Sequence, residues 1–508
     1  MPESSGPIHN QEFSSSALPV IERRDLGEEF SDVASAFDVV VIGAGTGGYV
    51  AAIRAAQLGL TTAVVERGAA LGGTCLNWGC IPTKALLEHA HAYKIAKSAR
   101  EWGITLSEGA TVGIDMNVVQ DRKDKIVKTL TGGIGHLFKK NRIEWIKGSA
   151  RLLGQGAIEV TDADGGTSRI TANKEIIVAT GSSPRSVPGI AFDYERIVTS
   201  TEAMNLRQVP KSIIVMGSGA VGVEFASIFN SFGTTDVTII ELLPRIVPNE
   251  DAAVSDTLEK SFRKKKIRVL TGTKVTAATN TGDAVEVTAQ LPDGSTEALT
   301  AEYLLVATGR GPVTDGLGAE ELGLEMERGY IKVDGLLRTN VPGVSAVGDV
   351  ITHGTSPHKQ LAHLSSAEGV LVAERIAGHT VRPIVSEHVP GCTYCDPEIG
   401  SVGLTEEQAR AKGYDVQIGS FPFGVLGRAR IANETEGFVK IVAEKKYDEI
   451  LGVHIIGPRA TELIAQATLA LRLECTVEEL IRTIQAHPTM SEAVGEAAHA
   501  AHGAPLHA

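Results

Sequence analysis

Two cysteines, Cys75 and Cys80, stand five positions apart, with glycines before them and Lys84 after them. Five residues of an ideal α-helix rise about 7.5 Å along its axis, whereas the Cα atoms of a disulfide lie closer than about 7 Å. A bridge therefore requires a distorted turn, for which Gly79 can supply the backbone freedom. Because a small strained ring is easily reduced, the pair is a candidate redox disulfide. The alternatives are two reduced core cysteines or half of a metal site, although metal pairs usually have about two to four intervening residues and a second cluster.

The composition excludes several classes of protein. The chain has 508 residues, its formal net charge is −13, and no basic run stands out beyond Arg263–Lys266. Nucleic-acid binding is therefore not expected. No apolar stretch approaches about 18 residues, so no membrane span is expected. Five cysteines in a chain of this length are not a disulfide scaffold, which predicts a reducing compartment, the cytoplasm.

The first 36 residues differ from the rest, because they are polar, Ser-rich and acidic. They lack both the apolar core of a signal peptide and the Arg-rich, acid-poor composition of a transit peptide. We expect residues 1–36 to be a flexible tail.

A dinucleotide-binding fingerprint follows this tail. It begins with a strand over 38–42 and a turn that contains Gly43, Gly45 and Gly48. A helix over 49–58, a second strand over 61–65 and the acid Glu66 follow. In this motif the first glycine makes the tight turn, the second admits a pyrophosphate, and the third lets the helix pack on the strand. The helix N-terminus binds the phosphates, and the acid is placed to bind a ribose hydroxyl.

A second fingerprint indicates a second dinucleotide and an electron path between the two. Its parts are the strand 212–216, Gly217, Gly219, Gly222, Glu224, the strand 237–240 and Glu241. A carboxylate at the end of that second strand accepts from a free 2′-hydroxyl and repels a 2′-phosphate. Glu241 therefore predicts NAD rather than NADP, and Arg245 nearby is only a weak argument for NADP.

The two nucleotide units end alike, since Ala179-Thr180-Gly181 is echoed by Ala307-Thr308-Gly309. This echo indicates that one nucleotide domain is inserted into the other. The chain then returns with a strand over 344–347 that ends at Gly348-Asp349. Such an aspartate could contact a ribitol or ribose hydroxyl, and an ordinary strand-to-turn aspartate explains it equally well.

From about residue 383 short alternating strands are mixed with helices, including a long Ala- and Leu-rich helix over 460–473. Near the end, His487 is followed five residues later by Glu492. A helix beginning near Thr489 would bring this carboxylate toward the imidazole, which suggests an acid–base pair. A lone histidine is more often structural.

The remaining cysteines carry no signal of a site. Cys392 and Cys395 lie three apart in a strand-like segment, where they would point to opposite faces and are poorly placed to bond or share a metal. We expect both, and the solitary Cys475, to be buried apolar residues.

Read together, the segment 72–84, both fingerprints and the His487 motif resemble the flavoprotein disulfide reductases, and among them those that oxidise dihydrolipoyl groups. The resemblance runs from about Phe37 into the C-terminal region. It implies an α/β fold with two Rossmann-like dinucleotide-binding domains, one inserted in the other, plus a C-terminal α+β dimerisation domain. The implied divisions are a tail (1–36), an FAD-binding domain (37–184), an NAD-binding domain (185–312), a central domain that completes the FAD site (313–382) and an interface domain (383–508).

The resemblance also assigns roles to the reactive residues. Cys80 would be the flavin-proximal thiol, and Cys75 the interchange thiol that meets substrate. Lys84 would pair with Glu224 beside the reactive edge of the isoalloxazine. The histidine–glutamate pair would come from the opposite subunit of a homodimer and complete the active site.

Two further sets of residues are implied as cofactor contacts, and no metal is expected. The FAD set is Gly43, Gly45, Gly48, Glu66, Gly73, Thr74, Lys84, Ala150, Ala179, Thr180, Gly181, Gly348, Asp349, Gln360, Leu361, Ala362 and His363. The NAD set is Gly217, Gly219, Gly222, Glu224, Glu241, Val275 and Gly309. The chain departs from the family pattern at Val313, at Leu364 and in a longer stretch between Asp349 and Gln360, all outside the redox chemistry.

The function implied by the resemblance is oxidation of protein-bound dihydrolipoyl groups to lipoyl through the Cys75–Cys80 disulfide and FAD, with hydride passed to NAD. The partner would be the lipoyl-bearing subunit of a 2-oxo-acid dehydrogenase complex or the carrier protein of glycine cleavage. A glutathione-type reductase would need basic residues where Glu241 stands, and a mercuric-ion reductase an extra cysteine pair after Thr476. A non-catalytic scaffold or redox sensor is the remaining alternative.

Overall fold

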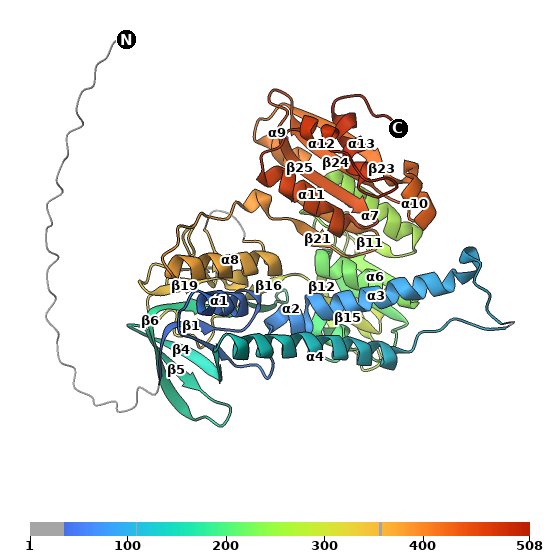
Figure 1. The fold of residues 1–508 in the computed structure, drawn as a ribbon. Coiled ribbons are helices and arrows are strands. Elements are labelled where there is room, and N and C mark those ends of the chain that lie inside the picture. Colours follow the sequence, from blue (N-terminus) through green and yellow to red (C-terminus); the bar gives the residue numbers. More distant parts are fainter. Residues whose placement is uncertain (1–34, 108, 355–357, 508) are drawn as a thin grey trace, which may run out of the picture.

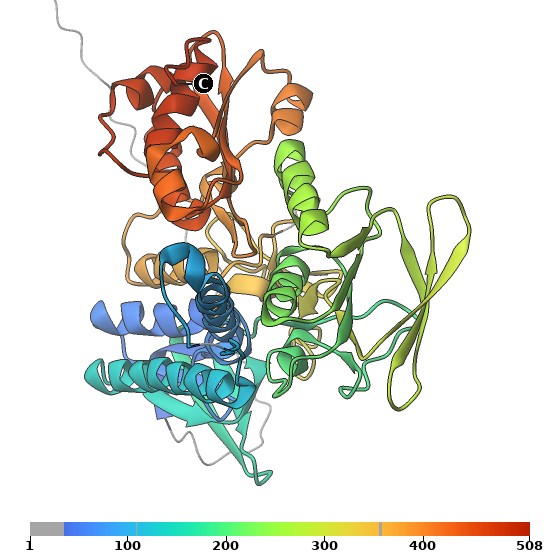
Figure 2. The same cartoon turned by 90° about the vertical axis from the view of Figure 1, so that its right-hand side faces the viewer.

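The chain folds into two nucleotide-binding units of the Rossmann type and a third, α+β unit stacked on both (Figures 1 and 2). The computed structural model describes residues 35–107, 109–354 and 358–507. The predicted tail lies outside these residues, except for Ser35 and Ala36, which begin the first strand. No helix among the described residues has the length and apolar character that crossing a bilayer requires.

The first sheet has the strand order β3-β2-β1-β6-β5-β4, and β19 pairs with β6. Its strands are β1 (Ser35–Ile42), β2 (Thr62–Glu66), β3 (Glu144–Lys147), β4 (Ser149–Gly154), β5 (Ala157–Thr161), β6 (Thr167–Val178) and β19 (Val344–Ala346). β1, β2, β3, β6 and β19 pair in parallel, while β4 and β5 form an antiparallel edge. Because β19 joins this sheet from far along the chain, the second nucleotide unit is inserted in the first, as predicted.

Both faces of the central strands are buried, which explains why these strands are continuously apolar. Val39, Val40 and Val41 of β1 are completely buried. The helices α1 (Thr46–Gln57) and α8 (Ala362–Ile376) pack side by side on one face (Figure 1). Four helices lie between β2 and β3 in the sequence: α2 (Gly73–Trp78), α3 (Cys80–Lys97), the 3₁₀ helix Ala99–Trp102 and α4 (Met116–Lys140).

The second unit repeats this plan with the parallel order β11-β10-β9-β15-β8. Its strands are β8 (Ile197–Val198), β9 (Ser212–Met216), β10 (Asp236–Ile240), β11 (Arg268–Leu270) and β15 (Tyr303–Val306), and its helices α5 (Ser200–Ala203), α6 (Ala220–Phe232) and α7 (Ala252–Lys264). An antiparallel sheet projects from it (Figure 2), made of β12 (Lys274–Asn280), β13 (Val285–Gln290) and β14 (Thr296–Ala301).

Short strands join the two units. β7 (Ser182–Pro184) pairs with β16 (Arg310–Pro312), so the two connecting segments run side by side. A small sheet combines β17 (Met326–Glu327), β18 (Tyr330–Lys332) and β20 (Ile351–Thr352).

The third unit is built on an antiparallel sheet of order β21-β22-β25-β24-β23. Its strands are β21 (Gly391–Thr393), β22 (Glu398–Gly403), β23 (Val416–Pro422), β24 (Phe438–Glu444) and β25 (Ile450–Gly457). Its helices are α9 (Glu406–Ala411), α10 (Gly427–Ala432), α11 (Ala460–Arg472), α12 (Val477–Arg482) and α13 (Glu492–Ala501). The predicted α/β architecture with an α+β C-terminal unit is therefore observed.

Candidate active site

Two adjoining cavities lie between the nucleotide units, and they share the lining residues Gly45, Thr74, Trp78, Ala179, Gly181, Ser182 and Arg310. The first has a volume of about 490 Å³. Predicted site residues that line it are Gly45, Thr74, Cys75, Cys80, Lys84, Ala179, Gly181, Glu224, Gly348, Asp349, Gln360, Leu361, Ala362 and His363. The second has a volume of about 420 Å³, and predicted residues that line it are Gly43, Gly45, Glu66, Gly73, Thr74, Ala150, Ala179, Thr180 and Gly181. The fold thus gathers residues from eight separate segments of the chain.

The cysteine pair sits at a break between two helices. α2 ends at Trp78, Gly79 adopts φ −140° and ψ −114°, and α3 begins at Cys80. This is the distorted turn that the five-residue spacing requires. A side chain at Gly79 would place its Cβ 2.8 Å from the Thr74 carbonyl oxygen, so the close approach of the two helices excludes any larger residue.

The two sulfurs of this pair differ in chemistry. Both are free thiols in the structure, the reduced form of the pair. The Cys75 thiol donates a hydrogen bond to Cys80, which lowers the pKa of Cys80 to about 7, helped by the nearby Lys84 cation and opposed by burial. The same hydrogen bond, together with burial, raises the pKa of Cys75 far above its ordinary value. Cys80 is therefore the thiolate of the reduced pair and the better leaving group.

A buried ion pair connects the cysteine helix to the second nucleotide unit. Lys84 Nζ in α3 lies 2.8 Å from both carboxylate oxygens of Glu224 in α6. Glu224 is only 3% exposed, and its Oε1 also accepts from the Tyr394 amide at 2.9 Å. The Tyr394 ring lies 4.5 Å from Lys84 Nζ, in cation–π range. All three units of the fold therefore meet at this carboxylate.

Arg310 is a candidate site residue that sequence reasoning missed. Its guanidinium donates to Ser182 Oγ at 2.7 Å, and Ser182 Oγ donates to Asp349 Oδ2 at 2.6 Å. It lines both cavities, and burial lowers its pKa against the opposing charges of Asp349 and Cys80. The signal that could have found it is its place directly after the repeated Ala-Thr-Gly strand ending.

The glycines of the first fingerprint fit a dinucleotide. A Cβ at Gly43 would lie 2.4 Å from the Ala179 oxygen, and one at Gly48 only 1.9 Å from the Gly43 oxygen, so protein packing requires both. A Cβ at Gly45 would meet only the Gly73 Cα, at 3.9 Å, so this glycine opens toward the cavity. That open face beside the N-terminus of α1 is where a pyrophosphate approaches the backbone.

The second fingerprint repeats this geometry. A Cβ at Gly217 would lie 2.5 Å from the Ala307 oxygen, and one at Gly222 2.0 Å from the Gly217 oxygen, whereas one at Gly219 would meet nothing within 4 Å. Gly309, with φ +125°, likewise faces open space. Val275 is 7% exposed and packs in the core of the second unit, so any nucleotide contact there would involve little of its side chain.

The acids after the two fingerprints are held in the same way. Glu66 Oε2 accepts from the Ala44 amide at 2.7 Å, and Glu241 Oε2 accepts from the Ser218 amide at 2.8 Å. Both amides belong to the residue between the first and second glycines. A carboxylate has about four acceptor positions, so each acid is oriented by the protein and keeps capacity for a ribose hydroxyl.

The predicted acid–base pair forms, but away from the cavities. His487 Nδ1 lies 2.8 Å from Glu492 Oε1, and Glu492 Oε2 accepts from the Thr489 amide at 2.9 Å. Although burial raises it, these hydrogen bonds hold the pKa of Glu492 below its usual value. The His487 side chain is 78% exposed, and neither residue is among the described residues that line the two cavities.

Two of the other cysteines differ in their surroundings. Cys395 is 1% exposed and packs in the core, as expected. Cys392 is only half-buried and lines the first cavity, so the expectation that it is merely a core residue was wrong. Its position on the short edge strand β21, which faces α3 and α6, explains the difference.

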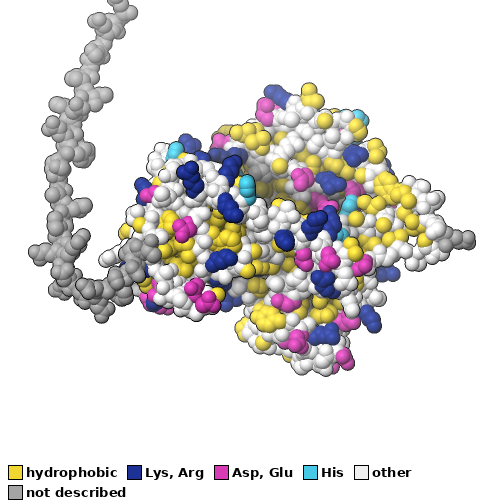
Figure 3. Space-filling view, turned by 60° about the horizontal axis from the view of Figure 1, so that its bottom comes forward, with side chains coloured by type: hydrophobic (Ala, Val, Ile, Leu, Met, Phe, Trp, Pro, Cys, Tyr) yellow, Lys and Arg dark blue, Asp and Glu magenta, His cyan; other side chains and the backbone are white. Residues whose placement is uncertain are grey.

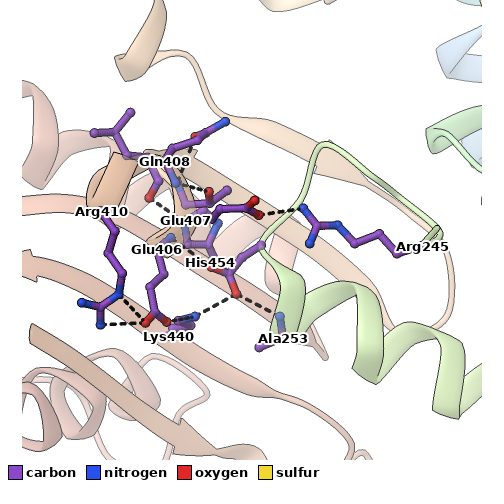
Figure 4. A network of polar contacts seen from close by, with 11 residues as sticks. Arg245, Ala253, Glu406, Glu407, Gln408, Arg410, Lys440 and His454 are labelled. Carbon is purple, nitrogen blue, oxygen red and sulfur yellow. Dashed lines mark hydrogen bonds and ion pairs between the residues drawn. The ribbon is translucent and has the colours of Figure 1, made fainter. Parts of the chain in front are cut away.

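Arg245, whose position after Glu241 is a weak indication of NADP, forms an ion pair with Glu407. Its Nη2 lies 3.1 Å from Glu407 Oε2 in α9 of the third unit (Figure 4). In the same network Lys440 Nζ lies 2.9 Å from Asp251 and 2.8 Å from Glu406. These contacts join the loop after Glu241 to the third unit and direct the Arg245 guanidinium toward a carboxylate.

Comparisons with known proteins agree with this geometry. The family model described as pyridine nucleotide-disulphide oxidoreductase matches residues 37–369, and the dimerisation domain of the same family matches 389–498. The chain belongs to the pyridine nucleotide-disulphide oxidoreductases. Dihydrolipoyl dehydrogenase of Bacillus subtilis is 44% identical over 94% of this chain and 100% of its own length. The mitochondrial dihydrolipoyl dehydrogenase 1 of Arabidopsis thaliana is 44% identical over 92% of this chain and 91% of its own.

Solved structures lead to the same family. The crystal structure of LpdA from Mycobacterium tuberculosis has a TM-score of 0.82 and 29% sequence identity, covering 92% of this chain and 99% of its own. The predicted family and fold class are thereby confirmed. The domain boundaries and the roles of individual residues stay predictions.

Proposed function

We propose that this pyridine nucleotide-disulphide oxidoreductase oxidises protein-bound dihydrolipoyl groups to lipoyl groups, with FAD and NAD as cofactors. The observation that carries the proposal is the Cys75–Cys80 pair, which lies beside the Lys84–Glu224 ion pair in a cavity reached from both fingerprints. The names of relatives that align with nearly the whole chain support the dihydrolipoyl substrate.

Residues of the first nucleotide unit would hold FAD. The open face at Gly45, the acid Glu66 and the Arg310–Ser182–Asp349 chain surround the two adjoining cavities. Thr180 lines the second cavity, and its buried hydroxyl has no hydrogen-bond partner among the described residues, as at a site where a bound group supplies one. Bound FAD would supply two-electron transfer between the thiol pair and NAD.

The chain's own residues account for the exchange of thiols. His487 of a second copy, oriented through Nδ1 by Glu492, would remove a proton from the substrate thiol at Nε2. The resulting thiolate attacks Cys75 Sγ of the disulfide, the Cys75–Cys80 bond breaks, and Cys80 leaves as a thiolate stabilised by Lys84. The second substrate thiol then displaces Cys75, which leaves an oxidised lipoyl group and a reduced cysteine pair.

This mechanism requires a homodimer. The dimerisation-domain match covers the segment that carries the acid–base pair, and His487 and Ile484 are both strongly exposed in a single copy. Hydrophobic side chains also gather on the segment that follows α3 (Figure 3), where Trp102, Ile104 and Leu106 are 48%, 52% and 40% exposed. We infer that a second copy contacts the third unit, and that the dimer acts in the cytoplasm on a lipoyl-bearing partner protein.

The test is NADH formation from dihydrolipoamide and NAD, with NADP and reduced glutathione as parallel controls. Rapid turnover with dihydrolipoamide and NAD alone supports both the substrate and the nucleotide. If the flavin is present and reducible by NADH but dihydrolipoamide gives no turnover, the substrate is another thiol. If NADH cannot reduce the bound flavin, the proposal that the protein is a redox enzyme fails.

A further inference from the structure

Three side chains outside the two cavities converge behind the wall of the first one. His353 follows β20, His358 precedes α8, and Glu368 lies within α8. One potential ligand atom from each lies within 4.8 Å of the others. The proposed reaction uses none of the three.

The His358 and Glu368 side chains are buried together, and one ring nitrogen of His358 has no hydrogen-bond partner among the described residues. The His358 and Glu368 side chains are 4% and 2% exposed, and His358 Nε2 lies 2.6 Å from Glu368 Oε1. The other ring nitrogen of His358, Nδ1, is buried and has no hydrogen-bond partner among the described residues. A buried polar atom without a partner is unusual in a native protein and calls for a ligand or an ion.

The carboxylate is also oriented from its other side. Glu368 Oε2 accepts from the Gly348 amide at 2.7 Å, which fixes the carboxylate plane. Metal sites characteristically hold their ligands with such additional hydrogen bonds. The third side chain, His353, is exposed, and its ring centroid lies 5.8 Å from that of His358. An ion therefore has a path from solvent to the buried pair.

We propose that His353, His358 and Glu368 form a binding site for a divalent transition-metal ion of the zinc type. Two imidazoles and one carboxylate are a ligand set that suits such an ion and leaves the fourth position to water. Ligand atoms about 2.1 Å from a tetrahedral ion lie about 3.4 Å apart. The three potential ligand atoms now lie within 4.8 Å of one another, so binding an ion would require only small side-chain shifts.

The site would be linked to the flavin side of the enzyme. Gly348, whose amide binds Glu368, lines the first cavity directly before Asp349. An ion would tie His353 and His358 to α8 and, through Glu368, to this wall. We therefore expect metal binding to raise the thermal stability of the flavin-loaded dimer.

The experiment uses the oxidised holoenzyme, treated with chelator and then dialysed against micromolar Zn²⁺. Oxidation keeps Cys75 and Cys80 in the disulfide, so that they do not bind zinc. We expect about one zinc per chain, with nitrogen and oxygen but no sulfur in its X-ray absorption spectrum. His353→Ala should weaken binding by about 10-fold or more, since even outer partners of metal ligands are worth about 10–100-fold. His379→Ala, at an exposed histidine just after α8, is the matched control and should bind normally.

Glu368→Gln serves as a second variant, with flavin content as the check on folding. Loss of zinc in both His353→Ala and Glu368→Gln, with flavin retained, supports the site. Absence of bound zinc in the wild type, a sulfur signal in its spectrum, or equal affinity in wild type and His353→Ala would each overturn it. None of these readouts depends on turnover, so they test the metal site independently of the proposed dihydrolipoyl activity.

Discussion

Lys84 Nζ lies 2.8 Å from each carboxylate oxygen of Glu224, although 140 residues separate the two in sequence. Lys84 belongs to the helix that begins at Cys80, and Glu224 belongs to the helix of the second fingerprint. The contact therefore fixes the thiol pair relative to the second fingerprint. It also leaves the cation close enough to Cys80 to affect that thiol.

Replacing Lys84 should raise the pKa of Cys80. The cation lowers this pKa and the Glu224 carboxylate raises it, so Lys84→Met removes the stabilising charge and leaves the opposing one. In the reduced wild type, alkylation of Cys80 by iodoacetamide should increase through a pH of about 7. The variant should need a higher pH for the same rate, whereas Lys97→Met, exposed on the same helix, should match the wild type. An unshifted profile in Lys84→Met would contradict the electrostatic role.

Replacing Cys75 should abolish turnover without loss of flavin. Cys75→Ser removes the sulfur that we propose the substrate attacks but leaves the glycines and the Arg310–Ser182–Asp349 chain intact. The measurements are dihydrolipoamide:NAD activity and the flavin-to-protein absorbance ratio. Loss of flavin in this variant would mean that the pair is structural. Cys392→Ser is the control at another thiol of the same cavity, and it should keep measurable activity.

Replacing His487 should slow attack on the disulfide by about 10²-fold or more, the usual contribution of general acid–base catalysis. His487→Gln keeps a polar side chain but cannot accept the substrate proton. The observable is the rate of cysteine-pair reduction by dihydrolipoamide in a single turnover. His502→Gln, which breaks a similar pair with Asp448 at 2.8 Å, is the matched control. Near-normal rates in His487→Gln would remove this residue from the mechanism.

Replacing Glu241 should lower the preference for NAD over NADP. Glu241→Ala removes the carboxylate that repels a 2′-phosphate, while Arg245 stays paired with Glu407. The double variant with Glu407→Ala releases Arg245 and should shift the preference further toward NADP. The ratio of kcat/KM for the two nucleotides is the measure, and Glu407→Ala alone isolates the effect of Arg245. An unchanged ratio in Glu241→Ala would assign nucleotide choice to other residues.

The sequence could predict the fingerprints because their signals are local. Glycine spacing, apolar strands and a terminal acid all fall within about 30 residues, and the structure repeats the same amide-to-acid bond at Glu66 and Glu241. Contacts between distant segments left no comparable signal. Arg310 reaches Ser182 across 128 residues, and Ser182 reaches Asp349 across 167. Only the folded sheet order brings these three together.

The last helix begins three residues later than the sequence predicts. A helix was expected to begin near Thr489, but α13 begins at Glu492. The Thr489 hydroxyl donates to the Ala486 oxygen, and the Thr489 amide donates to Glu492 Oε2, so a turn precedes the helix. The histidine–glutamate contact forms nevertheless, because this turn and the helix start bring the carboxylate to the ring.

Replacing Lys440 should destabilise the fold strongly. The Lys440 side chain is 8% exposed, and its ammonium contacts Glu406 (Figure 4) and the Asp251 carboxylate, whose side chain is 2% exposed. Breaking a buried pair by removing one partner costs about 3–5 kcal/mol, because the other charge stays buried. Lys440→Met should therefore lower Tm in calorimetry by several degrees. Lys445→Met, whose exposed pair with Asp415 contributes less than about 1 kcal/mol, should change it little.

The pH dependence of the lowered Tm in Lys440→Met distinguishes loss of the charge from loss of packing. Although burial raises it, the Lys440 hydrogen bond holds the pKa of Asp251 below its usual value in the wild type. That contribution to stability is present above the unfolded pKa and is lost as pH falls through the folded one. Without Lys440, burial should raise the pKa of Asp251 instead, so folding takes up a proton and acidification favours the variant. The difference in Tm between wild type and Lys440→Met should therefore narrow as the pH is lowered toward the titration of Asp251 in the variant, whereas a constant difference would indicate lost packing alone.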